Sequence, residues 1–200
     1  MAGFKTTLMT CQRCGRKIMV RGTDMEQGQI TCSHVGCGAI NSLQTTFQYD
    51  QSLALSLPAY GQLTYLNAES VVLPIRFGDN ILGTDASCDV RLERYQHEGH
   101  CYISRRHCLL TVSFDKWLGT LRYQLQDGSI DPTTKSLKTS LNGTYLNDVM
   151  LQKIEHIDMA DGDVITLGGI DRFRLSPYVI DPAMRETYQV TVPHSLDQTQ

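Results

Sequence analysis

Short stretches in which apolar and polar residues alternate recur along most of this chain, and turn residues separate them. Leu63 to Tyr65 and Val71 to Phe77 alternate in this way, which indicates strands with one buried face. Leu109–Phe114 and Leu121–Leu125 flank the turn at 116–119 and predict a hairpin. No long stretch has the apolar period of an amphipathic helix. The chain is therefore predicted to be all-β, as a sandwich or a barrel. Further strands are expected at Tyr145, Val164–Leu167 and Arg172–Leu175.

The composition allows one medium domain and a small module within 200 residues, 41% of them hydrophobic. The formal net charge of −3 is too balanced to predict nucleic-acid or membrane binding by itself. No early apolar run looks like a signal peptide, and no stretch is long enough to cross a bilayer. We therefore expect a cytoplasmic protein with no membrane partner. In that reducing compartment, paired cysteines indicate a metal before a disulfide.

Four of the seven cysteines form two pairs near the N-terminus. Cys11 and Cys14 are followed, after seventeen intervening residues, by Cys32 and Cys37, and each pair ends in Cys-Gly. This pattern resembles a zinc ribbon, in which two tight turns hold a structural Zn²⁺ in a tetrahedron of thiolates. Four cysteine ligands are expected, although His34 could replace Cys37 or Cys32. Lys17–Arg21 and Gln29–Thr31 are expected to pair as a hairpin between the two turns.

Residues 1–45 carry five basic and two acidic side chains, a formal charge of +3. Zinc ribbons often bind nucleic acid, but no aromatic residues interleave with these charges. Nucleic-acid binding through the ribbon is thus an open alternative, beside docking of a protein and a merely solvated basic face.

Two motifs in the larger part of the chain are more specific. Ser104-Arg105-Arg106-His107 is followed some thirty residues later by Ser140–Asn147, which reads Ser-Leu-Asn-Gly-Thr-Tyr-Leu-Asn. Together with Phe77–Leu92 upstream and Met159–Gly168 downstream, they resemble the forkhead-associated (FHA) domain. The resemblance implies an eleven-stranded antiparallel β-sandwich over residues 60–177. It also implies a module that binds a phosphothreonine-containing protein and catalyses nothing.

The rest of the chain divides around this domain. Residues 1–42 are expected to be the ribbon, residues 43–59 a linker or a strand that leads into the sandwich, and residues 178–200 a C-terminal tail. Pro74 within its strand predicts an edge position or a bulge. Asp127 to Thr139 exceeds the family pattern, and its Gly, Pro, Ser and Thr content is that of a loop beside the recognition loops.

The resemblance also assigns roles to individual residues. Ser104, Arg105 and Asn142 are implied to bind the phosphopeptide, with Ser104 at the start of a strand. Thr84 and Leu141 occupy two further binding positions, but Thr84 stands where the family has a phosphate-binding arginine, and Leu141 where it has a small polar residue. A phosphate prefers charged donors, so another cation must replace that arginine. The candidates are Arg105, Arg91, Lys135 and Lys138, whereas Arg106 is expected to be solvated. Four residues are implied to support the site, namely Gly83, His107, Gly143 and Asn147, with His107 as a buried brace.

Three functional classes follow. The first is a phosphothreonine-dependent adaptor with a structural zinc ribbon. The second is a degenerate FHA scaffold that docks proteins without phosphate, which Thr84 and Leu141 favour. The third is a nucleic-acid-associated regulator that acts through the ribbon. The chain is not expected to be an enzyme, because no nucleophile–base pairing or supported carboxylate pair is evident.

Overall fold

The computed structural model describes residues 7–43, 45–68 and 71–193. The described chain forms two compact units, one of residues 57–114 and 121–179 and the other of residues up to 56, 115–120 and from 180 on. The first unit holds β6 (Gln62–Tyr65), β7 (Val72–Pro74), β8 (Gly78–Gly83), β9 (Val90–Arg91), β10 (Cys108–Asp115), β11 (Thr120–Asp127), β12 (Ser129–Ile130), β13 (Leu137–Lys138), β14 (Thr144–Leu146), β15 (Val149–Met150), β16 (Ile157–Met159), β17 (Val164–Leu167) and β18 (Asp171–Ser176). The second holds β1 (Thr7–Thr10), β2 (Lys17–Val20), α1 (Gly22–Gln27), β3 (Gln29–Thr31), β4 (Ile40–Ser42), β5 (Thr45–Tyr49), α2 (Ser52–Leu55), α3 (Pro182–Thr187) and β19 (Gln189–Pro193).

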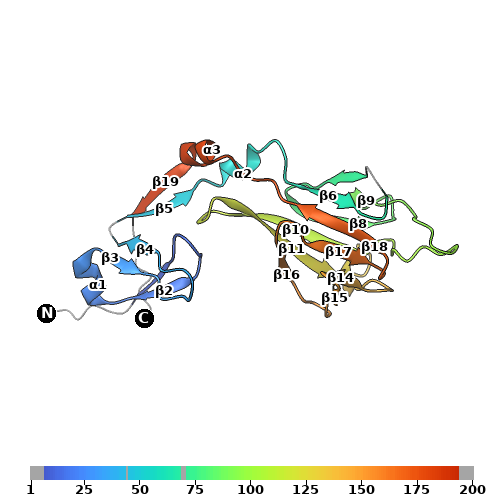
Figure 1. Cartoon of the computed structure of the whole chain (residues 1–200), viewed down its shortest axis with the longest axis horizontal. Coiled ribbons are helices and arrows are strands. Elements are labelled where there is room, and N and C mark those ends of the chain that lie inside the picture. Colours follow the sequence, from blue (N-terminus) through green and yellow to red (C-terminus); the bar gives the residue numbers. More distant parts are fainter. Residues whose placement is uncertain (1–6, 44, 69–70, 194–200) are drawn as a thin grey trace. The chain divides into compact units, whose positions relative to one another are not determined.

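The first unit is a β-sandwich of two layers (Figure 1). A five-stranded sheet has the order β16-β11-β10-β8-β9, and a six-stranded sheet has the order β15-β14-β17-β18-β6-β7. These two sheets contain the eleven strands that the resemblance implies. The pairing is antiparallel except between β8 and β9, which run parallel.

The core lies between the two sheets. Buried residues alternate with less buried ones along β10 and along β18, as expected for strands with one face on a core. Leu110 from one sheet and Ile165 and Phe173 from the other are fully buried in the same hydrophobic cluster. Burial of one such side chain contributes about 1.5–3 kcal/mol, so the sandwich has an adequate core of its own.

The strand predictions for this unit are largely confirmed. β10 and β11 are neighbours in their sheet and flank the turn at 116–119. β7, which contains Pro74, is the edge strand of the six-stranded sheet, where a residue without an amide hydrogen is tolerated. β7 is shorter than the alternation of Val71 to Phe77 predicts. The Asn80 side chain bonds the backbone of Arg76 on both its amide and its carbonyl, and so forms a tight turn there.

The excess segment before Ser140 is not the simple loop that its composition predicts. β12 and β13 pair as a separate two-stranded sheet, with Ser129 opposite Lys138. Asp131 closes the turn, because its side chain accepts hydrogen bonds from the amides of Thr133 and Thr134. Such local bonding by an aspartate gives a polar segment a defined shape. We call residues 128–139 the insertion hairpin.

The cysteine-rich part of the second unit contains two small hairpins. β1 pairs with β2, and β3 pairs with β4. The expected pairing of 17–21 with 29–31 is therefore wrong, and helix α1 lies between those segments. The physical reason is that each cysteine pair sits in the turn of its own hairpin, so each strand finds its partner across the nearer turn.

The remaining elements of this unit come from distant parts of the sequence. Residues 43–59 hold β5 and α2, and residues 178–200 hold α3 and β19. β5 pairs with β19, with Tyr49 opposite Gln189. The amide of Tyr49 also donates to the carbonyl of Lys116, in the turn between β10 and β11. None of the helices in the described residues is long and apolar enough to cross a membrane.

Candidate functional site

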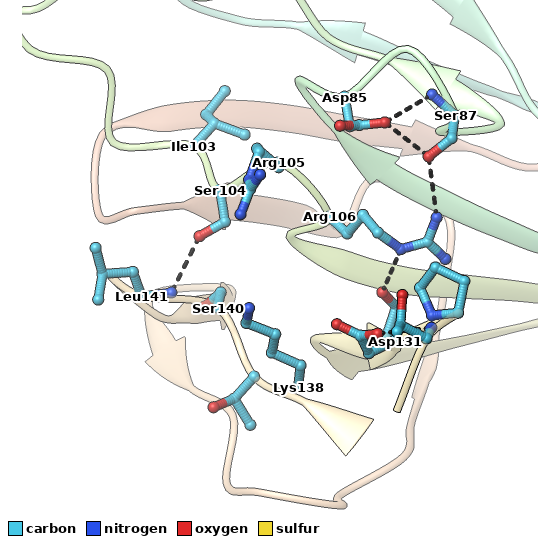
Figure 2. Close-up of a pocket in the computed structure, with 14 residues that line it drawn as sticks. Asp85, Ser87, Ile103, Ser104, Arg105, Arg106, Asp131, Lys138, Ser140 and Leu141 are labelled. Carbon is cyan, nitrogen blue, oxygen red and sulfur yellow. Dashed lines mark hydrogen bonds between the residues drawn. The ribbon is translucent and has the colours of Figure 1, made fainter. Parts of the chain in front are cut away.

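A pocket of about 740 Å³ opens on the sandwich where four loop segments meet (Figure 2). The segments follow β8, precede β10, form the insertion hairpin and precede β14. The lining residues are Asp85, Ser87, Ile103, Ser104, Arg105, Arg106, Ser129, Asp131, Pro132, Thr133, Lys138, Thr139, Ser140 and Leu141. These segments are far apart in sequence, so the fold itself creates the pocket.

The first two segments are joined through their backbones. The amide of Thr84 donates to the carbonyl of Ser104 at 3.3 Å, and that of Asp85 to the carbonyl of Arg105 at 2.9 Å. Gly83 permits this approach, since a Cβ there would lie 2.2 Å from the Arg105 carbonyl oxygen. A side chain at residue 83 would therefore push the two segments apart.

His107 joins the second segment to the fourth. Its ring is fully buried, and Nδ1 accepts a hydrogen bond from the amide of Ser104 at 2.8 Å. Nε2 lies 3.0 Å from the carbonyl oxygen of Gly143 and must donate, so the ring is the neutral Nε2–H tautomer. Burial lowers the pKa of His107, which favours this neutral form. The imidazole thus braces two loops and has no nitrogen left for catalysis.

Hydrogen bonds to Asp127 and Tyr102 hold the fourth segment, which leads into β14. Buried Asp127 accepts hydrogen bonds from the hydroxyls of Ser140 (2.7 Å) and Thr144 (2.6 Å). The Asn142 side-chain amide donates to the carbonyl of Tyr102 at 2.9 Å. Gly143 has φ +80°, a conformation that favours glycine. The Asn-Gly turn is therefore held firmly against the segment that precedes β10.

The chain that leads up to Ser104 is also held by a buried residue, Asp171. Asp171 is fully buried, and its Oδ1 accepts hydrogen bonds from the hydroxyl of Tyr65 (2.7 Å) and from Nε2 of His97 (2.8 Å). Tyr65 also stacks on Tyr95, with ring centroids 4.1 Å apart. These contacts fix residues 95–97 to the six-stranded sheet, upstream of Ser104.

Three cations and two carboxylates line the pocket. Arg105 and Lys138 have exposed side chains with no hydrogen-bond or ion-pair partner among the described residues. Hydrogen bonds from the amide and hydroxyl of Ser87, aided by the nearby arginines, hold the pKa of Asp85 below its usual range. Hydrogen bonds from the amides of Thr134 and Thr133 do the same for the pKa of Asp131. Both carboxylates are thus ionised at neutral pH and engaged by their own loops.

The structure brings together most of the residues that the resemblance assigns to binding. Ser104 and Leu141 both line the pocket, and the Leu141 amide donates to the Ser104 hydroxyl at 3.0 Å. Leu141 is 88% exposed. Thr84 is buried and does not line the pocket. Asn147 lies elsewhere, where its side chain bonds Asp163 and the amide of Val164.

Two expectations about the motif at 104–107 are wrong. Ser104 does not begin a strand: residues 104–107 form a bend, and β10 starts only at Cys108. The Ser104 amide is consequently committed to His107 and is not free for a phosphate. Arg106 is not simply solvated either, because it is half-buried and lines the pocket. Strand alternation cannot be applied to a bend, which is why it misplaced this side chain.

Of the cations expected to replace the missing arginine, Arg105 and Lys138 line the pocket, whereas Arg91 and Lys135 do not. The motif at 104–107 contains Arg106, but nothing in the sequence points to Ser87 and Ser129 as its partners. Those partners come from a turn and from the insertion hairpin, and only the folded chain brings them together.

The four N-terminal cysteines form a second candidate site. Their sulfur atoms all lie within 4.8 Å of one another. Cys11 and Cys37 are 3.7 Å apart at sulfur, and Cys14 and Cys32 are 3.8 Å apart. A tetrahedral Zn²⁺ with Zn–S bonds of about 2.3 Å places its sulfurs about 3.8 Å apart, so the cluster fits that ion. His34 is outside the cluster, and its Nε2 lies 3.1 Å from the carbonyl oxygen of Lys17.

Residues 80–168 match the family model of the FHA domain. No curated relative was found by sequence. Three solved structures illustrate the structural likeness. The MEK1 FHA domain in complex with a phosphothreonine peptide of HOP1 is 22% identical, with a TM-score of 0.46, over 60% of this chain and 99% of that one. The Slr1951 protein from Synechocystis sp. is 19% identical, with a TM-score of 0.45, over 60% and 99%. The yeast Dun1 FHA domain in complex with a doubly phosphorylated peptide is 21% identical, with a TM-score of 0.44, over 64% and 82%.

Proposed function

This chain contains an FHA domain, and we propose that it is a cytoplasmic adaptor that binds phosphothreonine-containing proteins through the pocket of that domain. It catalyses no reaction in this proposal. The observation that carries it is the meeting of Ser104 and Arg105 with Ser140 and Leu141, which precede the Asn142–Gly143 turn, at one pocket inside the segment that matches the family.

The geometry supports a phosphate-binding position between the side chains of Ser104 and Arg105. The Ser104 hydroxyl accepts from the Leu141 amide and keeps its own hydrogen for a phosphate oxygen. The Arg105 side chain is exposed and has no hydrogen-bond or ion-pair partner within the described residues, so its guanidinium is available for a charge-assisted bond. His107 and Gly83 hold the bend that presents both side chains. Asn142 is committed to Tyr102, and we propose that it orients the Asn-Gly turn and does not itself grip the peptide.

The ribbon has a structural role in this proposal. Cys11, Cys14, Cys32 and Cys37 would hold one Zn²⁺, which would supply the stability that a module of this size lacks. All four positions of a tetrahedral ion would be filled by thiolates, so no position is left for a substrate.

A second candidate function is protein docking without phosphate. Thr84 favours it, because a buried threonine cannot supply the charge that the usual arginine provides. Leu141 also favours it, because its exposed side chain would give a partner protein an apolar contact where the family has a small polar residue.

A titration with matched phosphothreonine and threonine peptide libraries tests the proposal. The wild-type chain should bind a subset of phosphorylated peptides weakly and their unphosphorylated counterparts undetectably. Ser104→Ala combined with Arg105→Ala should abolish that binding. Lys153→Ala, an exposed lysine that does not line the pocket, is the matched control and should leave it unchanged.

Equal binding of both members of each peptide pair would instead support phosphate-independent docking. Tight phosphopeptide binding that survives the double substitution would mean that the ligand lies elsewhere, and the site would have to be withdrawn.

A further inference from the structure

Of the three cationic side chains that line the pocket, Arg106 is the one with hydrogen-bond partners among the described residues. Its Nε donates to the Ser129 hydroxyl at 3.3 Å, its Nη1 to the Ser87 hydroxyl at 3.3 Å and its Nη2 to the Ile130 carbonyl at 3.5 Å (Figure 2). These partners come from the turn after β8 and from the insertion hairpin. The guanidinium therefore has a defined position between two segments.

All three of those partners are neutral. In the part of the chain that the structure describes, no carboxylate forms an ion pair with Arg106. The side chain is nevertheless half-buried, which removes part of the water that would otherwise solvate its charge. A guanidinium has five N–H donors, so three long bonds leave it able to bind a further acceptor. A fixed, partly dehydrated cation that has no direct carboxylate partner is a favourable place for an anion.

The charges around Arg106 strengthen this argument. Lys138, on the insertion hairpin, lines the same pocket. Its side chain is exposed and has no hydrogen-bond or ion-pair partner among the described residues, although its charge helps to lower the pKa of Asp131. The two carboxylates of the pocket, Asp85 and Asp131, accept hydrogen bonds from their own loops. They reduce the positive charge of the pocket without neutralising Arg106 directly.

We propose that Arg106 and Lys138 form a second anion subsite, which binds an acidic side chain of the partner peptide near its phosphothreonine. The anion is a carboxylate or a second phosphate, since both fit a guanidinium in the same way. This inference rests on the proposed function, because it assumes that the peptide enters the pocket beside Ser104. Ser104 and Arg106 lie on opposite sides of the pocket, so one peptide can reach both (Figure 2).

The subsite would determine specificity. The insertion hairpin supplies Lys138 and two of the three groups that orient Arg106. The chain would therefore select phosphothreonine sequences with a nearby negative charge.

Three series of peptides test the subsite. Each carries one phosphothreonine, and each flanking position in turn is alanine, glutamate or phosphoserine. At one or more positions, the wild-type chain should bind the glutamate or phosphoserine peptide about tenfold or more tightly than the alanine peptide. The two anionic series show which source of negative charge is preferred. Arg106→Gln should bring that ratio close to one.

Lys135→Gln is the matched control, because Lys135 is on the same hairpin but does not line the pocket, and it should keep the wild-type ratio. Lys138→Gln gives a second measurement if Arg106→Gln does not fold, and it should reduce the ratio about threefold. A wild-type ratio near one at every position, or a ratio that Arg106→Gln leaves unchanged, would overturn the proposal.

If no phosphothreonine peptide binds, the proposed function fails, and inorganic phosphate then tests the subsite alone. In NMR spectra, the Nε–Hε signal of Arg106 should shift and saturate as phosphate is added to the wild-type chain, and Lys138→Gln should weaken that response. An Arg106 signal that phosphate does not move would overturn the subsite independently of the peptide results.

Discussion

Thr84 is the residue at which this pocket departs most from what a phosphate requires. It follows Gly83 in the segment paired to Ser104 and Arg105, but its side chain is buried and does not reach the pocket lining. The positive charge of the pocket therefore comes from the bend at 104–107 and from the insertion hairpin.

Substitution of Thr84 tests whether a positive charge at this position would strengthen phosphate binding. Thr84→Arg should strengthen binding of phosphothreonine peptides about ten- to a hundredfold, because one charge-assisted hydrogen bond contributes about 1.5–3 kcal/mol. Thr84→Val, which keeps the shape but adds no charge, should leave the affinity unchanged. Isothermal titration of both variants, each first checked for thermal stability, makes the comparison. Equal affinities for the two variants would contradict this reading of the position.

His107 leads to a prediction about pH. Burial lowers the pKa of His107 in the folded chain below its ordinary value of 6.5, so the unfolded chain takes up the proton first as the pH falls. The contribution of His107 to stability should therefore decrease below about pH 6.5, by up to about 1.4 kcal/mol for each pH unit, and should be constant above it. NMR of the imidazole nitrogens should show the neutral Nε2–H tautomer at pH 7 to 8. A ring that takes up its proton at a higher pH than an unperturbed histidine would contradict this account.

At the level of single residues, the sequence identified the polar side chains of the site better than the atoms to which they are hydrogen-bonded. The motif singled out Ser104 and His107 correctly as neighbours of the Asn-Gly turn. It could not show that the Ser104 amide is bound to His107, or that Arg106 faces the pocket. Both depend on the bend at 104–107, and one strand-like motif does not reveal where regular backbone begins.

The insertion hairpin is the element that most distinguishes this pocket. β12 and β13 form a two-stranded sheet separate from both layers of the sandwich. Replacement of residues 129–138 by a short glycine-rich turn should therefore preserve the sandwich, because the cost of closing a loop depends only weakly on its length. It should also weaken peptide binding, because Ser129, Asp131 and Lys138 would be removed from the pocket wall.

Thermal unfolding and peptide titration of the same shortened chain separate these two effects. Loss of the folded sandwich would mean that the hairpin is part of its structural core. Unchanged peptide affinity would remove the hairpin from the site.

Sequence periodicity predicted the elements that pair with near neighbours and missed several others. The hairpin of β10 and β11 and the edge position of Pro74 follow from local patterns. The hairpin of β12 and β13 was missed because its composition is polar, and its shape depends on hydrogen bonds of Asp131. The pairing of β5 with β19 leaves no local signal, since the strands are far apart in sequence.

At the scale of the whole molecule, the cysteine cluster predicts that metal and fold are coupled in one part of the chain. Purified protein should contain one zinc ion, and a strong chelator should remove it together with the ordered structure of residues 7–43. Cys14→Ser should abolish zinc binding, because it removes one of four ligands. Cys101→Ser, a half-buried cysteine outside the cluster, is the control and should retain a full equivalent of zinc.

Elemental analysis measures the metal, and NMR spectra recorded before and after chelation show which residues lose order. The sandwich should remain folded without zinc, since its core contains none of the four cysteines. Loss of both units on chelation would contradict this separation, and a zinc-free purified protein would refute the metal site.

The pairing of β5 with β19 has a consequence for how the chain is made. A ribosome releases β5 early, but its partner strand is synthesised only after the entire sandwich. During that interval the backbone groups of β5 that bond β19 have no partner, and an unpaired strand edge is a site for association with other chains. The sandwich, whose strands all lie between the two, can fold while the other unit waits. Synthesis of this protein thus has a fixed order, in which every strand of the sandwich is made before the strand that pairs with β5.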